Sequence, residues 1–440
     1  MSAASEHGQR WRPWMQRALQ LAALASGRTS PNPLVGCVIL SAGGELVGEG
    51  FHARAGQPHA EVGALRQAGE RARGGTAVVS LEPCCHHGRT PPCSQALIAA
   101  GVARVVLAMA DPDPRVAGRG IAELRAAGLE VIEGVCEAEA RCLNRAFIHR
   151  VQHGRPLGVL KWAMSADGRT ALPNGSSQWI SGPAARQWVH TLRAQCDAVI
   201  VGGGTVRADD PLLTSRGQRH PEPLRVVLSR RLDLPPDAQL WNQDTAPTLV
   251  AHGPEAPAEA IARLEANGVE HLELAPCEPL QLLQALAGRG CNQVLWECGP
   301  ELAAAALRQG CVQRIAAVTA PKLLGGLAAR TPLGDLGLSD VSEAEPWNGD
   351  QLQRLGDDES VDDGVGDLGI DRDSNVAEQR PGRRRPDDEG GRLAPGARED
   401  VAQVLGRLER DEDGGGGVLL VLDLGLGQRG LVVDAPVDRL

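Results

Sequence analysis

The 440 residues of this chain exceed what one ordinary hydrophobic core holds, so we expect two domains and some additional chain. The formal net charge of −10, from 55 acidic and 45 basic residues, argues against a protein that wraps nucleic acid, because phosphate binding needs a basic surface. A small anionic substrate held by a few local arginines remains compatible with this charge. The sequence has no run of about 18 apolar residues, which argues against a transmembrane helix.

The cysteines and the N-terminal segment both favour a cytoplasmic protein. The eleven cysteines are scattered and odd in number, which indicates free thiols, some of them on a metal, rather than a secreted disulfide framework. The segment Met15–Ala25 is the one candidate signal peptide, but Gln16, Arg17 and Gln20 interrupt its apolar run. We therefore predict an amphipathic helix there.

The first third of the chain alternates predicted helices and strands. Helices are predicted at Trp14–Ser26, His59–Ala68 and Ser94–Ala100, and strands at Leu34–Leu40, Leu46–Phe51, Ala77–Leu81 and Val102–Ala108. This alternation predicts a three-layer α/β/α domain over residues 1–150. The segment His149–Arg155 is polar and basic, and we interpret it as a connector.

A second α/β domain is predicted over residues 156–345. Its strands are expected at Leu157–Met164, Ala198–Val201, Leu224–Leu228, Thr248–Ala251, Gln293–Glu297 and Ile315–Ala320. Its helices are expected at Pro183–Ala194, Ala258–Ala266, Pro279–Ala287 and Glu301–Gln309.

The composition changes after about Glu345. Residues 350–416 are dense in Asp, Glu, Arg and Gly, and only Val418–Leu424 resembles a strand. Such a composition buries too little apolar surface to offset chain entropy. We therefore interpret residues 346–440 as a low-complexity tail, disordered or aberrant. It is the product of a shifted reading frame or, alternatively, a genuine acidic extension.

A zinc site is predicted by His59-Ala60-Glu61, followed by Pro83-Cys84 and by Cys93. Zinc binds imidazole and thiolate in a tetrahedron and, in catalytic sites, leaves one position for water. The metal lowers the pKa of that water, and a glutamate beside it shuttles protons. This H-x-E…P-C…C pattern is typical of nucleobase deaminases, in which the glutamate is not a ligand.

The ligand set has alternatives. Cys84 and Cys93 are separated by eight residues, where nucleobase deaminases usually have C-x-x-C. Cys85 is adjacent to Cys84, and His86 and His87 also offer ligand atoms. We favour His59, Cys84 and Cys93, because Cys93 begins a predicted helix, whose N-terminus stabilises a thiolate. Isolated structural cysteines would not explain the joint pattern.

The second domain carries weaker signals. Gly202-Gly203-Gly204 follows a strand, but Arg207 stands where a G-x-G-x-x-G fingerprint needs its last glycine, so a tight turn is an equally good interpretation. The segment Glu297–Pro300 leads from a strand into a helix and suits a pyrophosphate better. Lys161 lies inside an apolar run, so it is either functional or points out of the sheet.

Longer segments of the chain resemble one family. They are Pro31–Cys37, His59–Val62, Leu81–Cys93, Thr205–Pro211, Glu297–Pro300 and Ala320–Gly326, within a resemblance over about residues 11–345. Their pattern resembles the bifunctional deaminase/reductase of riboflavin biosynthesis, in which the long cysteine spacing is typical. Cys85 departs from the serine that this family usually has there.

The resemblance implies a multifunctional enzyme, a zinc hydrolase and an NADPH-dependent oxidoreductase. A cytidine-deaminase-like domain would remove the 2-amino group of 2,5-diamino-6-ribosylamino-4(3H)-pyrimidinone 5′-phosphate. A dihydrofolate-reductase-like domain would then reduce the ribosyl group to ribityl. The resemblance also implies a homodimer. It further implies that a short β-hairpin closes the reductase sheet after Trp347. Because the composition changes after about Glu345, we expect this hairpin to be missing, which would leave an edge of the sheet unpaired.

The resemblance assigns roles residue by residue. His59, Cys84 and Cys93 would bind zinc, and Glu61 would be the proton shuttle. NADPH would contact Ala163, Trp179, Thr205, Asp209, Ser229, Gly299, Pro300, Glu301, Leu302, Ala303, Ala304 and Ala305. Substrate would contact Asn32, Arg89, Thr90, Ser177, Arg193, Leu213, Arg216 and Glu297. From its own position in an apolar run, we assign Lys161 a role in orienting substrate near Asp209 and Glu297.

Three other functions compete with this interpretation. A nucleic-acid or nucleoside deaminase would share the zinc motif, but basic patches and stacking aromatics are expected there, and this chain has no Tyr and two Phe. A zinc-stabilised scaffold without activity would not need Glu61. A deaminase whose reductase half is impaired by the aberrant C-terminus is the third alternative.

Overall fold

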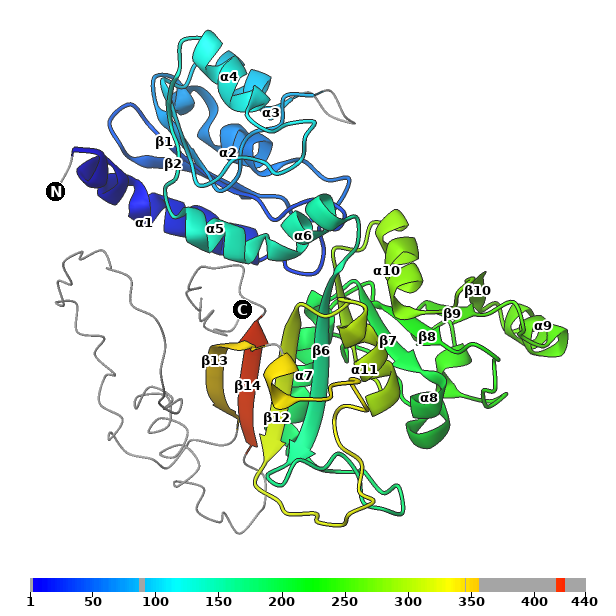
Figure 1. Ribbon diagram of the computed structural model, residues 1–440. Helices are drawn as coiled ribbons and strands as arrows, with labels where there is room; N and C mark the ends of the chain where they lie inside the picture. The colour runs from blue at the N-terminus through cyan, green and yellow to red at the C-terminus, as the bar shows by residue number, and fades with distance from the viewer. Residues whose placement is uncertain (1–2, 87–91, 345, 356–416, 424–440) are drawn as a thin grey trace, which may run out of the picture.

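The computed structural model describes residues 3–86, 92–344, 346–355 and 417–423. Figure 1 shows two α/β domains, each built on its own sheet. The N-terminal sheet has five strands in the order β2-β1-β3-β4-β5, and the C-terminal sheet has nine in the order β10-β9-β8-β7-β11-β6-β12-β14-β13. Within the described residues, no helix is both long and apolar enough to cross a membrane.

The N-terminal domain confirms the predicted three layers. Its strands are β1 (Gly36–Leu40), β2 (Leu46–Phe51), β3 (Thr76–Val79), β4 (Arg104–Leu107) and β5 (Glu130–Ile132). Its helices are α1 (Ala3–Ala23), α2 (Ala60–Ala68), η1 (Gly69–Ala72), α3 (Cys93–Ala99), α4 (Arg119–Ala126), α5 (Glu137–Leu143) and α6 (Arg145–His153).

Apolar side chains of β1 point alternately to the two faces of this sheet, which explains why both faces are covered. Val38 and Leu40 pack into a core with α1, whereas Cys37 and Ile39 pack into a second core with α2, α3 and α4. The buried side chains of Met15 and Ala18 confirm that the N-terminal segment is an amphipathic helix.

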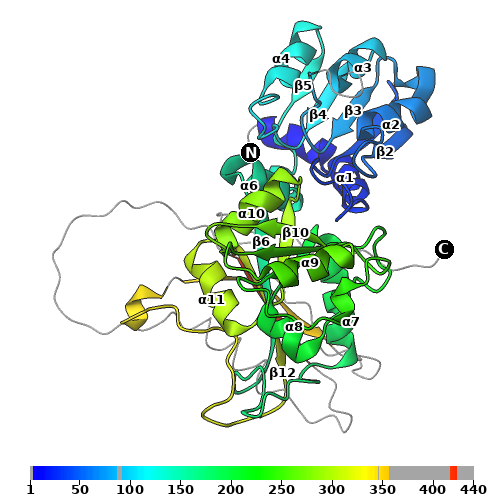
Figure 2. The ribbon, with the colours of Figure 1, turned by 90° about the vertical axis from the view of Figure 1, so that its right-hand side faces the viewer.

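The interpretation of His149–Arg155 as a connector is wrong for most of its length. Helix α6 extends through His153, and Phe147, Ile148 and His149 are buried. The apolar pair at 147–148 was a helix signal that the basic residues around it obscured. Figure 2 shows α6 next to α10 (Pro279–Gly288) of the C-terminal domain, so this segment belongs to the packing of the two domains.

In the part of the chain that the structure describes, the C-terminal domain has seven parallel strands and two antiparallel ones. The parallel strands are β6 (Leu157–Ser165), β7 (Ala198–Gly202), β8 (Leu224–Leu228), β9 (Thr248–His252), β10 (Glu270–Glu273), β11 (Gln293–Trp296) and β12 (Arg314–Ala320). The helices besides α10 are α7 (Pro183–Gln195), α8 (Gly203–Asp209), η2 (Gln239–Trp241), α9 (Ala258–Ala266), α11 (Pro300–Arg308) and η3 (Val341–Glu343). Alternating residues of β7 face two separate cores, which confirms a sheet covered on both sides.

The expectation of a missing hairpin is wrong. Strand β14 (Gly417–Asp423) pairs with β12, and β13 (Asn348–Leu355) pairs with β14, both antiparallel, so the edge of β12 is covered. The boundary at residue 345 is therefore too early. Trp347 does lead into β13, as predicted, and the strand expected at Val418–Leu424 is confirmed by β14. The interpretations of residues 356–416 and 424–440 lie outside the described residues.

Candidate active sites

Three metal-binding side chains converge in the N-terminal domain. His59 immediately precedes α2, Cys84 lies in the loop after β3, and Cys93 is the first residue of α3. The Nδ1 atom of His59 lies 3.6 Å from Cys84 Sγ and 3.3 Å from Cys93 Sγ. Atoms on a tetrahedron around zinc are separated by roughly 3.5 Å, since ligand bonds are about 2.0–2.3 Å. This donor set therefore fits zinc.

The surroundings of Cys84 favour its thiolate form. The hydrogen bond from Cys93, together with His59, lowers the pKa of the Cys84 thiol to about 4. The backbone N–H of Cys93 also donates to Cys84 Sγ, over 3.4 Å. A thiolate is the form that binds metal, and metal binding releases protons from thiol ligands.

Glu61 lies in the first turn of α2, two residues after His59. Its side chain is buried, and its Oε2 atom has no hydrogen-bond partner among the described residues. Burial raises the pKa of this carboxyl group. A buried carboxylate oxygen without a partner is costly, which indicates that it faces a group that binds during function.

The structure favours the predicted zinc ligands over the alternatives Cys85 and His86. The described residues contain one group of three or more metal-binding side chains close enough for a shared ion, and it includes neither Cys85 nor His86. His87, Arg89 and Thr90 lie outside the described residues. Their predicted roles therefore stay predictions.

His52 is a site residue that the sequence analysis missed. Its Nε2 atom lies 3.0 Å from Nδ2 of Asn32, and its ring packs edge-on against His59 at 5.3 Å between centroids. The structure thus brings the predicted substrate contact Asn32 to the zinc-site cluster through His52. No local spacing around His52 predicted this contact, because the three residues come from separate segments.

Glu82 organises the loop behind the zinc site. Its buried carboxylate accepts hydrogen bonds from four backbone N–H groups, those of Asp111, Gly118, Gly120 and Ile121. A Cβ at Gly120 would lie 2.2 Å from the Pro83 carbonyl oxygen, so only glycine fits there. The Glu82 contacts therefore fix the segment that precedes Cys84.

A charged cluster forms at the carboxyl end of β11, beside the middle of β6. Arg193 pairs bidentately with Glu297 at 2.6 and 3.0 Å, and Lys161 Nζ lies 3.7 Å from the same carboxylate. The structure confirms the expected proximity of Lys161 and Glu297. Asp209 instead lies near Ser177, with 3.5 Å between their oxygens. Burial, followed by the positive charge of Arg193, lowers the pKa of the nearby His190, a residue that the sequence analysis missed.

Removing the Glu297 charge should make stability depend less on pH. Burial alone would raise the pKa of Glu297, but Arg193 and Lys161 overcome it and lower the pKa to about 2. Because this folded-state pKa lies below the unfolded value of about 4.3, the stabilisation is complete above that pH and is lost as pH falls towards 2. We expect Glu297→Gln to lower the free energy of unfolding at pH 7 by roughly 3 kcal/mol.

The measurement is urea unfolding of both proteins between pH 2 and 7. The difference in free energy of unfolding between the wild-type protein and Glu297→Gln should narrow as pH falls through about 4. Glu259→Gln is the matched control, because Glu259 is exposed on α9 and its loss should change little at any pH. A difference that stays constant with pH would contradict the ion-pair assignment.

The predicted NADPH contacts gather at the carboxyl ends of adjacent strands. Ser229 follows β8 and Gly299 follows β11, and on the neighbouring strand between them Gly202 ends β7 and Gly203 begins α8. A Cβ at Gly203 would lie 3.0 Å from Ser229 Oγ, and one at Gly202 would lie 3.2 Å from Leu302. A Cβ at Gly299 would meet nothing within 4 Å, so the N-terminus of α11 is open. The carboxyl end of a parallel sheet and a free helix N-terminus suit a dinucleotide phosphate.

The other predicted NADPH and substrate contacts lie on several different elements of the C-terminal domain. Thr205 and Asp209 lie on α8, Ala163 lies on β6, and Trp179 is 64% exposed with the Arg186 guanidinium over its ring. Leu213 and Arg216 have positive φ angles of 55° and 56°, on a loop whose Thr214 carbonyl accepts a hydrogen bond from Arg193. This loop is thereby attached to the Arg193–Glu297 pair.

Comparison with known proteins identifies both domains. Residues 9–109 match the family described as the cytidine and deoxycytidylate deaminase zinc-binding region, and residues 156–358 match the RibD C-terminal domain. The second match extends through β13, in agreement with the later domain boundary. Fold and sites together define a zinc-dependent deaminase joined to an NADPH-dependent reductase.

This chain covers nearly the whole length of relatives that have both domains. The riboflavin biosynthesis protein RibD of Synechocystis sp. is 52% identical over 344 residues, 78% of this chain and 93% of that protein. RibD of Escherichia coli is 43% identical over 362 residues, 78% and 96% of the two chains. The solved structure of Acinetobacter baumannii RibD, form 1, is 43% identical and covers 79% and 96% of the chains, with a TM-score of 0.72. The chain belongs to the RibD family and is a bifunctional deaminase/reductase of riboflavin biosynthesis that uses zinc and NADPH on a small-molecule substrate.

Proposed function

We propose that the N-terminal site deaminates a diaminopyrimidine ribonucleotide and that the C-terminal site reduces the ribosyl group of the product. A relative of solved structure from Thermotoga maritima, 35% identical with a TM-score of 0.71, is named a diaminohydroxyphosphoribosylaminopyrimidine deaminase/5-amino-6-(5-phosphoribosylamino)uracil reductase. The convergence of His59, Cys84 and Cys93 beside the unpartnered Glu61 oxygen carries the first half of the proposal.

In the deaminase site, His59, Cys84 and Cys93 would hold the zinc, which would supply the Lewis acidity that lets water ionise near neutral pH. Glu61 accepts a proton of the attacking water and delivers it to the ring nitrogen, and it then carries the proton of the newly formed hydroxyl group to the leaving amine. Asn32, fixed through His52, binds the pyrimidine. Arg89 and Thr90 remain our candidates for the phosphate.

In the reductase site, residues at the ends of β7, β8 and β11 would hold NADPH, which would supply the hydride. Glu297 and Lys161 orient the ribosyl group, and Arg193 holds Glu297 with two of its N–H groups. A phosphate on Arg193 would compete with this pair. We therefore assign the phosphate to Arg216, whose loop is attached to Arg193 through Thr214.

We also infer a homodimer and a cytoplasmic location. All eleven cysteines are free, which supports a reducing compartment. The dimer rests on the family resemblance, and light scattering of the purified protein measures it directly.

Product masses test the proposed function. The purified protein is incubated with the diaminopyrimidine nucleotide, first without and then with NADPH. We expect exchange of one amino group for oxygen in the first case and a further gain of a hydride and a proton in the second. Deamination without any reduced product would favour an impaired reductase half. An unchanged substrate would overturn the proposal.

A further inference from the structure

The loop Ser30–Asn32, which joins α1 to β1, contacts both domains. On one side, the Asn32 amide lies 3.0 Å from His52, which packs against the predicted zinc ligand His59. On the other side, the loop rests on residues at the amino ends of β7 and β11, strands of the reductase domain. The loop that carries a predicted substrate contact is thus held by the other catalytic domain.

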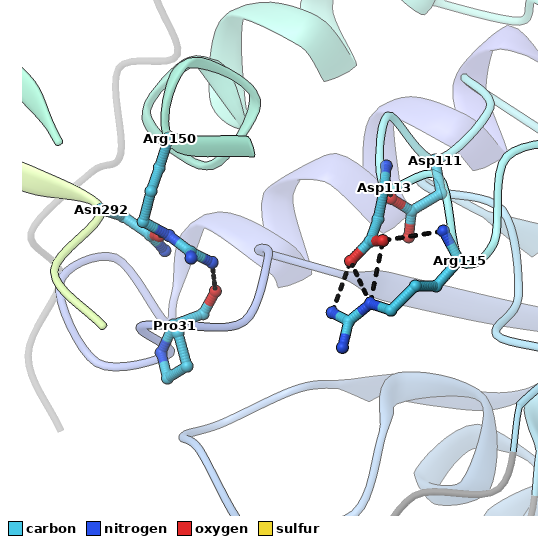
Figure 3. A network of polar contacts seen from close by, with 6 residues as sticks. All are labelled: Pro31, Asp111, Asp113, Arg115, Arg150 and Asn292. Atoms are coloured by element: carbon cyan, nitrogen blue, oxygen red, sulfur yellow. Dashed lines mark hydrogen bonds and ion pairs between the residues drawn. The ribbon is translucent and has the colours of Figure 1, made fainter. Parts of the chain in front are cut away.

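Three hydrogen bonds and one packing contact attach this loop. Arg150 of α6 donates to the Pro31 carbonyl at 2.8 Å, and Asn292 donates through Nδ2 to the Asn32 carbonyl at 3.3 Å. Ser30 Oγ donates to Asp197 at 2.8 Å. Gly290 packs against the Pro31 ring, which a Cβ there would approach to 3.2 Å. Figure 3 shows Arg150 between Pro31 and Asn292.

The reductase residues that hold the loop are themselves fixed. Asn292 is 6% exposed, and its Oδ1 atom accepts a hydrogen bond from Arg150 at 2.5 Å. The Oδ2 atom of Asp197 accepts from the backbone N–H groups of Asn292 and Gln293, at 2.7 and 3.0 Å. Asp197 and Asn292 precede β7 and β11, which are adjacent and parallel. Buried polar groups satisfied in this way hold a single geometry.

We propose that Asn292 is a positioning residue for deamination, which fixes the Asn32 backbone so that its amide is ready for the pyrimidine. This inference rests on the proposed function of the N-terminal site. Asn292 touches no reacting atom and acts through Asn32. Without Asn292, the loop would have to become ordered when substrate binds. The conformational entropy lost in that ordering would weaken substrate binding. The loss should therefore appear in the KM for deamination rather than in its kcat.

The test uses full-length, zinc-loaded protein. Asn292→Ala should raise the KM for the diaminopyrimidine nucleotide about 10-fold, with kcat changed much less and zinc content unchanged. Because Asn292 leads into the strand that ends before Glu297, a second variant changes the loop side alone. Ser30→Ala removes the bond to Asp197 and should raise the same KM by a smaller factor, while KM and kcat for reduction of pre-deaminated substrate stay unchanged.

Asn267→Ala is the matched control, an exposed asparagine of the same domain whose side chain caps α9. Asn292→Asp retains the acceptor for Arg150 but not the donor to Asn32, so it should resemble Asn292→Ala in KM. If the wild-type chain deaminates and both Asn292→Ala and Ser30→Ala keep its KM, the inference is overturned although the proposed function stands. Equal losses in deamination and reduction by Ser30→Ala would also overturn it. A wild-type chain without deamination would overturn both.

Discussion

Glu61→Gln should slow deamination by about 10²–10⁴-fold while zinc stays bound. The substitution keeps the size of the side chain but removes the group that accepts and returns the proton. Glu61 is buried with one oxygen unpartnered, so an amide fits the same space without displacing His59. Deamination is measured from product formation and zinc from metal analysis of the same preparation.

Two comparisons make this result specific. Glu70→Gln, in η1 of the same domain, changes an exposed glutamate and should leave deamination unchanged. Reduction of pre-deaminated substrate by Glu61→Gln should also be unchanged, because Glu61 lies in the other domain. Near-normal deamination by Glu61→Gln would exclude Glu61 as the proton shuttle.

Cys84→Ser and Cys93→Ser should each lose zinc, with affinity at least about 100-fold weaker, since even the neighbours of metal ligands contribute 10–100-fold. The two Sγ atoms and His59 Nδ1 already lie at distances close to those in a zinc tetrahedron. Deamination should be lost together with the metal. Zinc content after dialysis against a weak chelator measures the effect.

Cys85→Ser is the matched variant for this experiment. Cys85 adjoins Cys84 but does not belong to the converging group, so zinc and deamination should both be retained. This serine would also restore the residue that the family usually has at the position. Loss of zinc from Cys85→Ser would show that the ligand set is wrong.

Local sequence signals predicted much of this protein. The bounds of β2, β8 and α9 agree with the predicted segments Leu46–Phe51, Leu224–Leu228 and Ala258–Ala266. Apolar periodicity suffices there, because each element buries its own regularly spaced face. The zinc site was also predictable, since His59 and Cys93 stand at the starts of helices that periodicity located and Cys84 lies in the loop after a predicted strand.

The contacts between distant segments were decided by the tertiary structure alone. Asn32 meets His52, and Arg193 meets Glu297, only because the order of the strands brings them to one place. Helix α6 was obscured by its basic residues, and the covering of β12 by β14 joins strands separated by about a hundred residues of chain. Periodicity reports which face of an element is buried, but not against which partner. That choice follows from packing and hydrogen bonding over the whole molecule, which also attaches the loop at Ser30 to Asp197 in the other domain.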